Sequence, residues 1–532
     1  MNKNKSEKNN FQDDIKKHKK LLEIFSSVLF GRLVFVFFLI FLQILLIFVL
    51  TKKFSSYISF YFGGSILFST IFMCYLSNSK GKNEFKIAWI LPMVIFPFFA
   101  IFAYILYHVD YGGYKFKKQI VAIKNETDKF LPPLEETCQT LKKYPEIGDL
   151  AFYLDKLGHY PSFENNELKY YPSGEEFFPD FICELEKAEK FIFIEYFIIK
   201  IDESWGKVLD VLTRKAKEGV EIRILFDAIG SVSAASSRYV KFLKSLGINA
   251  QIFSPIFPVF SIHYNNRDHR KIVVIDGKTS FTGGVNIANE YFNVGKGKFK
   301  YWKDTAIKIK GSAIKNFTVM FLHTWNLGIK NYKEDFEKYI NVDYEVFKPN
   351  GLVTPYGDNA FNNEDIAENI YRWIIGSSKK YVHITSPYLV IDNQLACDLI
   401  FAAHRGIDVS LILPGKGDHY VTYAIGKTFI KDLVDNGVKV YLYKNDSFIH
   451  AKMFISDDKT AAIGSVNLDY RSLYHHFECG VLLHQCDEIG QMEKDFMETL
   501  KDCVLLDKDF YKKVPFITKL IGKSLRIMAP LF

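Results

Sequence analysis

The chain has 532 residues, of which 48% are hydrophobic and 24% are charged, and this composition excludes an intrinsically disordered protein. Its seven cysteines are scattered and form no C-x-x-C pair, which excludes a disulfide-stapled miniprotein and predicts packing thiols. The net charge of +8 comes entirely from residues 1–107, with 13 Lys and Arg against 5 Asp and Glu, because the remainder carries 55 of each sign. A nucleic-acid-binding surface is therefore not expected.

Three long uncharged runs follow the basic head of the chain, at residues 33–50, 54–79 and 87–107. About 20 residues of α-helix cross the hydrocarbon core of a bilayer, so each run is long enough to span it. A cleaved signal peptide would also explain the first run, but the head before that run is too long for one. We therefore expect residues 1–110 to form a membrane anchor, and the protein to be a multi-pass protein of the cell membrane.

The orientation of this anchor stays open. Eight basic residues in the head favour a cytoplasmic N-terminus, and three crossings would then place the rest of the chain outside. Lys115, Lys117 and Lys118 follow the last run and favour the cytoplasm for the rest of the chain. That arrangement would require one of the runs to be re-entrant or interfacial.

A polar connector over residues 111–162 leads into strand and helix patterns that occur twice. The apolar segment at 190–200 matches the one at 381–390, and residues 216–227 match 402–414, with offsets of 187–190 residues. Alternating strands and helices predict an α/β sheet, and so long a period predicts duplicated domains. The predicted parts are a first half-domain at 163–345, a second at 346–510, and a terminal segment at 511–532 that is either a packed helix or an interfacial one.

Each copy contains one H-x-K-x4-D motif, followed by Gly and Asn at the same spacing. The first comprises His269, Lys271, Asp276, Gly283 and Asn286, and the second comprises His450, Lys452, Asp457, Gly464 and Asn467. One such motif is a weak signal, because a histidine on a strand is more often an ordinary core or surface residue. Two motifs in one register inside a repeat indicate a functional site.

The residue types in this pattern suit a phosphodiester. Side chains at i and i+2 of a strand share a face, so each histidine should lie beside its lysine. If the two copies pack about a pseudo-twofold axis, two imidazoles, two ammonium groups and two asparagine amides meet in one cleft. Lysines and amides would hold the non-bridging oxygens, a neutral imidazole would attack phosphorus, and a protonated one would protonate the leaving alkoxide. No metal or other cofactor is expected, because the lysines supply the positive charge and the sequence offers no evident ligand cluster.

At these residues the sequence resembles the phospholipase D superfamily and, within it, the bacterial cardiolipin synthases. The resemblance covers about residues 55–532 and includes the segments EYFIIKIDESWGKVL, IRILFDAIGS, YWKDTAIKIKG, ITSPYLV and HHFECGVLLH. It implies N-terminal transmembrane helices followed by two pseudo-symmetric phospholipase D-type α/β/α half-domains that share one active-site cleft. The implied reaction is reversible transfer of a phosphatidyl group between two phosphatidylglycerol molecules through a phosphohistidine, which gives cardiolipin and glycerol.

The resemblance also implies a role for each site residue. His269 would be the nucleophile and His450 the acid for the leaving glycerol, while Lys271, Lys452, Asn286 and Asn467 would hold the phosphoryl oxygens. Asp304 in WKDT and Glu478 in HFECG would orient the two histidines. Asp276 and Asp457 belong to the catalytic motif, and the sequence leaves open whether they touch substrate or fix local structure.

Four other functions compete with this one. A phospholipase D hydrolase, or a phosphatidyltransferase with another acceptor alcohol, would use the same residues, so only the anchor and the extent of the resemblance favour cardiolipin. A nuclease of the superfamily is disfavoured by the balanced charge. A membrane scaffold with a dead site is disfavoured by the two intact motifs. The expected partners are phosphatidylglycerol and the bilayer, without nucleic acid, and the number of subunits stays open.

Overall fold

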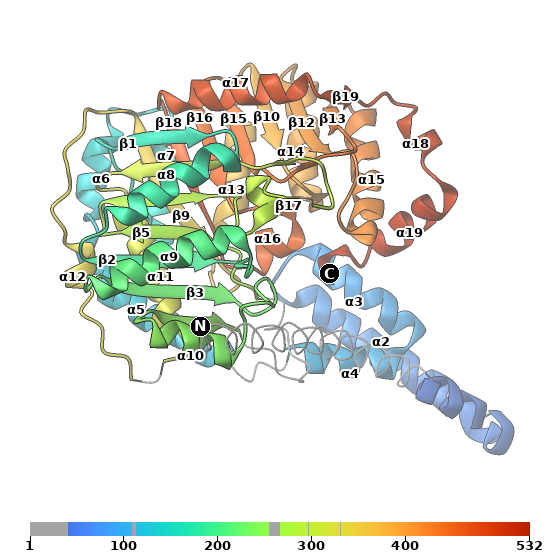
Figure 1. Cartoon of the computed structure of the whole chain (residues 1–532). Coiled ribbons are helices and arrows are strands. Elements are labelled where there is room, and N and C mark those ends of the chain that lie inside the picture. The colour runs from blue at the N-terminus through green and yellow to red at the C-terminus, as the bar shows by residue number, and fades with distance from the viewer. Residues whose placement is uncertain are drawn as a thin grey trace. The chain divides into compact units, whose positions relative to one another are not determined.

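The computed structural model describes residues 41–49, 51–108, 113–254, 266–295, 297–329 and 331–531. These residues form two units (Figure 1). The first unit contains the described residues up to 108 together with 527–531, and the second contains those from 113 to 526. Of the apolar run predicted at 33–50, residues 41–49 are helical, and residues 33–40 and 50 lie outside the described residues.

The first unit is helical. Its elements are η1 (Ser55–Tyr57), α2 (Ile58–Asn78), α3 (Asn83–Ile95), α4 (Pro97–His108) and η6 (Ala529–Leu531). Among the described residues, Ser55–Asn78 is the one helical stretch that is long and apolar enough to cross a membrane. Three spanning helices, and with them a multi-pass topology, are therefore not confirmed.

The third apolar run is not the single helix predicted for residues 87–107. It divides at Phe96 into α3 and α4, which have 13 and 12 residues and are each too short to span a bilayer alone as straight helices. Pro97 explains the break, because proline has no backbone N–H and forces the preceding residue out of the helical conformation. Pro92 is accommodated inside α3, and Phe96 N–H donates to its carbonyl over 2.7 Å.

The second unit begins with short helices and contains two mixed sheets. The helices are α5 (Gly113–Thr127), η2 (Asp128–Phe130), α6 (Leu134–Leu141), α7 (Gly148–Tyr153) and the π-helical turn η3 (Leu154–Gly158). The region predicted as a polar connector is thus largely helical, and α5 packs on α11 (Ile314–Asn326) with Ile123 fully buried.

The two sheets have the same strand order when read from equivalent edges. The first runs β1 (Glu167–Tyr171), β8 (Ala306–Lys310), β6 (Thr279–Gly283), β5 (Lys271–Ile275), β2 (Phe191–Tyr196), β3 (Glu221–Asp227), β4 (Asn249–Phe253). The second runs β9 (Leu352–Asp358), β18 (Glu478–His484), β16 (Thr460–Gly464), β15 (Met453–Ser456), β10 (Tyr381–Thr385), β12 (Asp408–Pro414), β13 (Lys439–Tyr443), β19 (Cys503–Leu505). Apart from the added β19, every strand of one sheet has a counterpart in the other, which confirms the predicted duplication of an α/β half-domain.

Helices cover the sheets and also link them (Figure 1). Those of the first half-domain are α8 (Gly174–Glu186), α9 (Glu203–Lys217) and α10 (Ser237–Ser245), and those of the second are α13 (Ile366–Ser377), α14 (Asn393–His404) and α15 (Tyr420–Asp435). One hydrophobic core joins α8 and α9 to the first sheet. A second core joins both sheets to α11 and to α17 (Glu488–Leu500), so the two half-domains share their interior.

Several short elements complete the second unit. They are η5 (Asn289–Phe292), β7 (Trp302–Lys303), α12 (Glu337–Ile340), β11 (Leu389–Val390), β14 (Phe448–Ile449), β17 (Leu468–Asp469), α16 (Tyr470–Tyr474), α18 (Phe510–Lys513) and α19 (Phe516–Arg526). The pairing of β14 with β7 is parallel and joins the two half-domains. A bridge between Asp268 and Phe477 joins them in the equivalent way.

Candidate active site

The two motif histidines occupy equivalent positions, each just ahead of a central strand of its own sheet. His269 lies two residues before Lys271, where β5 begins, and His450 lies between β14 and β15. Both side chains are buried. The N–H of His269 donates to the carbonyl of Phe477 over 2.8 Å, and that of His450 donates to the carbonyl of Lys303 over 2.7 Å. Each histidine is therefore held in place by backbone from the other half-domain.

The carboxylate partners also cross between the half-domains. Nδ1 of His269 lies 2.9 Å from Oε1 of Glu478, and Nδ1 of His450 lies 2.6 Å from Oδ2 of Asp304. Both carboxyl groups are completely buried. Among the described residues neither histidine has a hydrogen-bond partner for Nε2, so in each ring this nitrogen remains available for chemistry.

The two histidine pairs differ in their electrostatics. Burial lowers the pKa of His269 to about 3, while the nearby His269 and His476 side chains hold the pKa of Glu478 well below its usual value despite its burial. Burial also lowers the pKa of His450, but it raises the pKa of Asp304 to about 7. The first pair thus consists of a neutral imidazole and an ionised carboxylate, whereas the second holds a proton near neutral pH.

The two motif lysines are buried beside the histidines and lack an ion-pair partner. Nζ of Lys271 donates to the carbonyl of His269, and Nζ of Lys452 donates to that of His450. Neither ammonium group has a carboxylate within ion-pair distance among the described residues. Burial lowers the pKa of Lys271 to about 8 and that of Lys452 to about 7. Two buried, unpaired cations favour an anionic ligand, because an anion would offset the cost of burying them.

The two motif asparagines are also buried. The side-chain oxygen of Asn286 accepts a hydrogen bond of 3.1 Å from the N–H of Ile198, which leaves its NH₂ group as a donor. The side-chain oxygen of Asn467 has no hydrogen-bond partner among the described residues. The amides therefore add hydrogen-bonding capacity without charge.

The two motif aspartates accept hydrogen bonds from the backbone. Asp276 accepts hydrogen bonds of 2.7–2.8 Å from the N–H groups of residues 189, 190 and 191, where β2 begins. Asp457 accepts bonds of 2.7–2.9 Å from residues 379, 380 and 381, where β10 begins. Each aspartate comes directly after a central strand, and the histidine of the same motif comes just before that strand. At about 3.3 Å per residue, the length of the strand separates the aspartate side chain from the histidine side chain. Of the two roles that the sequence left open, these contacts favour the structural one and give no support to a catalytic one.

Two further residues of the second half-domain contact Glu478. Ser465 donates its hydroxyl to the carboxylate, and Nδ1 of His476 lies 3.5 Å from Oε1. The rings of His476 and His269 have centroids 5.5 Å apart, and donor atoms of His269, His476 and Glu478 all lie within 4.8 Å of one another, as a metal site would require. His476 belongs to the segment HHFECG, and the sequence predicted no role for it. In the first half-domain Trp302 takes the place of His476, two residues before Asp304.

Comparisons with known proteins agree with this geometry. The family described as "Cardiolipin synthase, PLD-like domain" matches residues 181–325 and 371–500. An "Uncharacterized protein" of Streptococcus mutans is 40% identical, with 86% of this chain and 98% of the relative covered. A "Cardiolipin synthase" of Geobacillus kaustophilus is 31% identical, with 87% and 94% covered. A solved structure described as phosphatidylserine synthase of Haemophilus influenzae shares the fold, with a TM-score of 0.55, 16% identity, and 72% of this chain and 98% of that chain covered.

Proposed function

The chain belongs to the family of cardiolipin synthases with a PLD-like domain, and from this membership we propose that it transfers a phosphatidyl group from one phosphatidylglycerol to another. The products are cardiolipin and glycerol. One phosphodiester replaces another, so the reaction needs no high-energy donor. The observation that carries the proposal is the pair of histidine and lysine sets, in which each histidine is held by a carboxylate of the other half-domain.

The hydrogen bonds favour His269 as the nucleophile. The ionised carboxylate of Glu478 is an acceptor only, so Nδ1 of His269 carries the hydrogen and donates it. Nε2 then bears the lone pair, and the neutral imidazole is ready to attack phosphorus. The low pKa of His269 keeps this form in place throughout the neutral range.

The same reasoning favours His450 as the acid. Nζ of Lys452 lies 2.8 Å from Nδ1 of His450, and an ammonium group can only donate. Nδ1 therefore accepts, and the ring hydrogen is on Nε2, from which it can pass to the leaving glycerol oxygen. Asp304 holds a proton near neutral pH and can return it to Nδ1 as the first proton leaves.

The two steps balance with these groups alone. In the first, a bond forms between Nε2 of His269 and phosphorus, the bond to the glycerol oxygen breaks, and that oxygen takes a proton from the His450–Asp304 pair. In the second, the hydroxyl of the acceptor lipid returns a proton to this pair and attacks phosphorus, which releases His269. Lys271, Lys452 and the two asparagines stabilise the charge on the phosphoryl oxygens in both steps.

We further infer that residues 1–110 hold the enzyme at the cell membrane, where its lipid substrates are. The apolar stretch Ser55–Asn78 supports at least one crossing. The apolar helices α3 and α4 support a larger anchor, and a multi-pass topology is the arrangement that we propose. Contact with the bilayer also raises the local concentration of acceptor lipid relative to water.

The experiment that tests this function uses purified full-length protein in phosphatidylglycerol vesicles. We expect cardiolipin and glycerol in equal amounts and little phosphatidic acid, because the phosphohistidine meets a lipid hydroxyl before water. His269→Ala, assayed in parallel, should form neither product. Mainly phosphatidic acid would make the protein a hydrolase, and transfer only to an added alcohol would make it a phosphatidyltransferase with another acceptor.

A further inference from the structure

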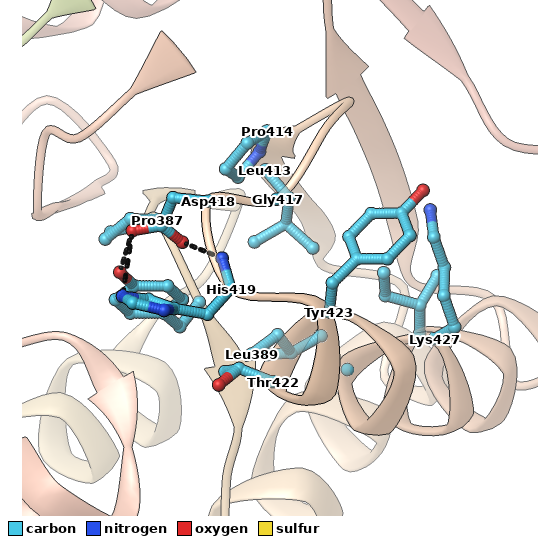
Figure 2. A pocket seen from close by; sticks show the side chains of 13 residues that line it. Pro387, Leu389, Leu413, Pro414, Gly417, Asp418, His419, Thr422, Tyr423 and Lys427 are labelled. Atoms are coloured by element: carbon cyan, nitrogen blue, oxygen red, sulfur yellow. Dashed lines mark hydrogen bonds and ion pairs between the residues drawn. The ribbon is translucent and has the colours of Figure 1, made fainter. Parts of the chain in front are cut away.

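A cavity in the second half-domain is lined by a buried lysine, Lys427, which forms no ion pair within the part of the chain that the structure describes. The cavity lies between the segment after β10, the loop after β12 and the start of α15, and its walls are mainly apolar, with Leu389, Leu413 and Ile430 among them (Figure 2). Lys427 lines it with only 5% of its surface exposed, and no carboxylate or hydrogen-bond acceptor contacts its ammonium group among the described residues. That group lies 4.6 Å from the ring centroid of Tyr423.

The other side of the cavity carries a fixed carboxylate. Oδ2 of Asp418 accepts a hydrogen bond of 2.7 Å from the hydroxyl of Tyr388, and Oδ1 accepts one of 2.8 Å from the N–H of His419. Figure 2 shows Asp418 and Lys427 on opposite sides of the view, with Tyr423 between them. The cavity therefore has an acceptor at one end and a cation at the other.

The acidic end of this cavity is close enough to His450, the motif histidine of the same half-domain, for the charge of Asp418 to act on that histidine. The charge of Asp418 acts to raise the pKa of His450 and also that of Tyr291, although burial keeps the pKa of His450 low. The Tyr291 ring in turn lies 5.4 Å from the His450 ring, centroid to centroid. A molecule that fills the cavity would thus reach from Lys427 toward His450.

The first half-domain lacks the helical turns that build this cavity. The equivalent helices α10 and α15 end 190 residues apart in the sequence. At this offset Lys427 corresponds to Ser237, which is the first residue of α10. α15 therefore has seven residues before Lys427 that α10 does not have, and Thr422 and Tyr423, which line the cavity, are among them. The cavity is therefore a difference between two otherwise equivalent halves. A reaction in which one lipid is donor and another is acceptor requires such a difference.

We propose that this cavity binds the headgroup of the acceptor phospholipid, with its phosphate at Lys427 and its glycerol hydroxyls at Asp418. The assignment rests on the proposed function. A buried ammonium group without a partner is stabilised by an anion, and the phosphate is the anion that the acceptor carries. The glycerol hydroxyls of the headgroup can donate hydrogen bonds to the carboxylate of Asp418. The terminal hydroxyl then lies toward His450, which takes its proton in the proposed reaction.

The test compares two rates of the full-length enzyme in phosphate-free buffer. One is cardiolipin formation in phosphatidylglycerol vesicles, and the other is exchange of labelled glycerol into phosphatidylglycerol, whose acceptor has no phosphate. Lys427→Met should lower the ratio of the first rate to the second about tenfold, as expected for a lost hydrogen bond to a charged group. Lys427→Arg should restore most of that ratio, because it keeps the charge. The control is Lys431→Met, one turn further along α15, where Lys431 pairs with Asp435 at the surface; it should match the wild type.

Each alternative gives a different result. Equal loss of both rates, or an unchanged ratio, would overturn the acceptor site. A difference between Lys427→Met and the wild type that appears only when inorganic phosphate is added, at constant ionic strength, would assign the cavity to free phosphate and overturn the lipid assignment. A wild-type enzyme that exchanges glycerol but makes no cardiolipin would refute the proposed function itself, whatever the variants do.

Discussion

The proposed division of labour between the two histidines leads to a prediction about their carboxylate partners. Glu478→Gln should impair nucleophilic attack, whereas Asp304→Asn should impair protonation of the leaving group. Both carboxyl groups are fully buried and contact only one of the two motif histidines each, at 2.9 Å and 2.6 Å from Nδ1. The two substitutions are nearly isosteric, so differences between them report on charge and proton position rather than on packing.

The expected loss follows from the contacts of Glu478. A hydrogen bond to a charged group contributes about 1.5–3 kcal/mol, which corresponds to about 10- to 150-fold in rate. In addition, the glutamine amide can donate to Nδ1 of His269, which would move the ring hydrogen to Nε2 and remove the nucleophilic lone pair. A comparable carboxylate-to-amide change in the serine protease triad costs about 10⁴-fold. We therefore expect Glu478→Gln to lower kcat by about 10²- to 10⁴-fold.

The assay that separates the two steps uses a donor lipid with a p-nitrophenyl headgroup, whose leaving group departs as a stable anion without an acid. Asp304→Asn and His450→Ala should recover most of the first-step rate with this donor, measured as the initial burst of nitrophenolate. Glu478→Gln and His269→Ala should stay impaired. Recovery of the Glu478 variant alone would show that the roles of the histidines are reversed, and recovery of neither carboxylate variant would refute the division of labour.

The other predictions concern structure, metal and pH. Asp276→Ala or Asp457→Ala should lower the melting temperature, because three backbone N–H groups lose their acceptor, and the folded fraction should keep its KM. Activity should survive treatment with EDTA. If EDTA abolished the activity and one metal ion restored it, the group formed by His269, His476 and Glu478 would hold a required ion. Finally, kcat/KM should fall as pH rises through about 7–8, because Lys452 and Lys271 lose their protons there; a rate that increases across this range would contradict the role of their charge.

The motif spacing predicted that the two sets of residues occupy equivalent places, because two copies of one pattern at the same register require equivalent places in equivalent folds. His269 and His450, with their lysines, indeed occupy matching positions beside matching strands. The spacing could not predict that each histidine takes its carboxylate from the other half. That pairing depends on how the half-domains pack, and only the resemblance to a known family pointed to Asp304 and Glu478.

Other features were missed because they depend on three-dimensional surroundings. Lys427 is one of many lysines in the sequence, and only the fold shows that it is buried without an ion-pair partner among the described residues. His476 lies two residues before Glu478 in the sequence, but only the pairing between the two half-domains brings it close to His269. The break at Phe96, in contrast, could have been predicted from Pro97, because a proline disfavours the helical conformation of the residue before it and has no N–H to continue the helix.

The structure suggests why duplication suits the proposed reaction, in which the two histidines hold opposite proton states. Duplication places the two imidazoles at equivalent positions, but by itself it would also make them identical. The difference comes from their partners: Glu478 is contacted by His269, His476 and Ser465, whereas Asp304 accepts a backbone hydrogen bond from Thr305 and faces His450. Burial raises the pKa of both carboxyl groups, but the His269 and His476 side chains hold that of Glu478 well below its usual value. The charge of Lys452 and the hydrogen bond from Thr305 offset burial less at Asp304, whose pKa is about 7. Because each carboxylate belongs to the half-domain opposite its histidine, neither half alone could hold either proton state, and the two must act as one enzyme.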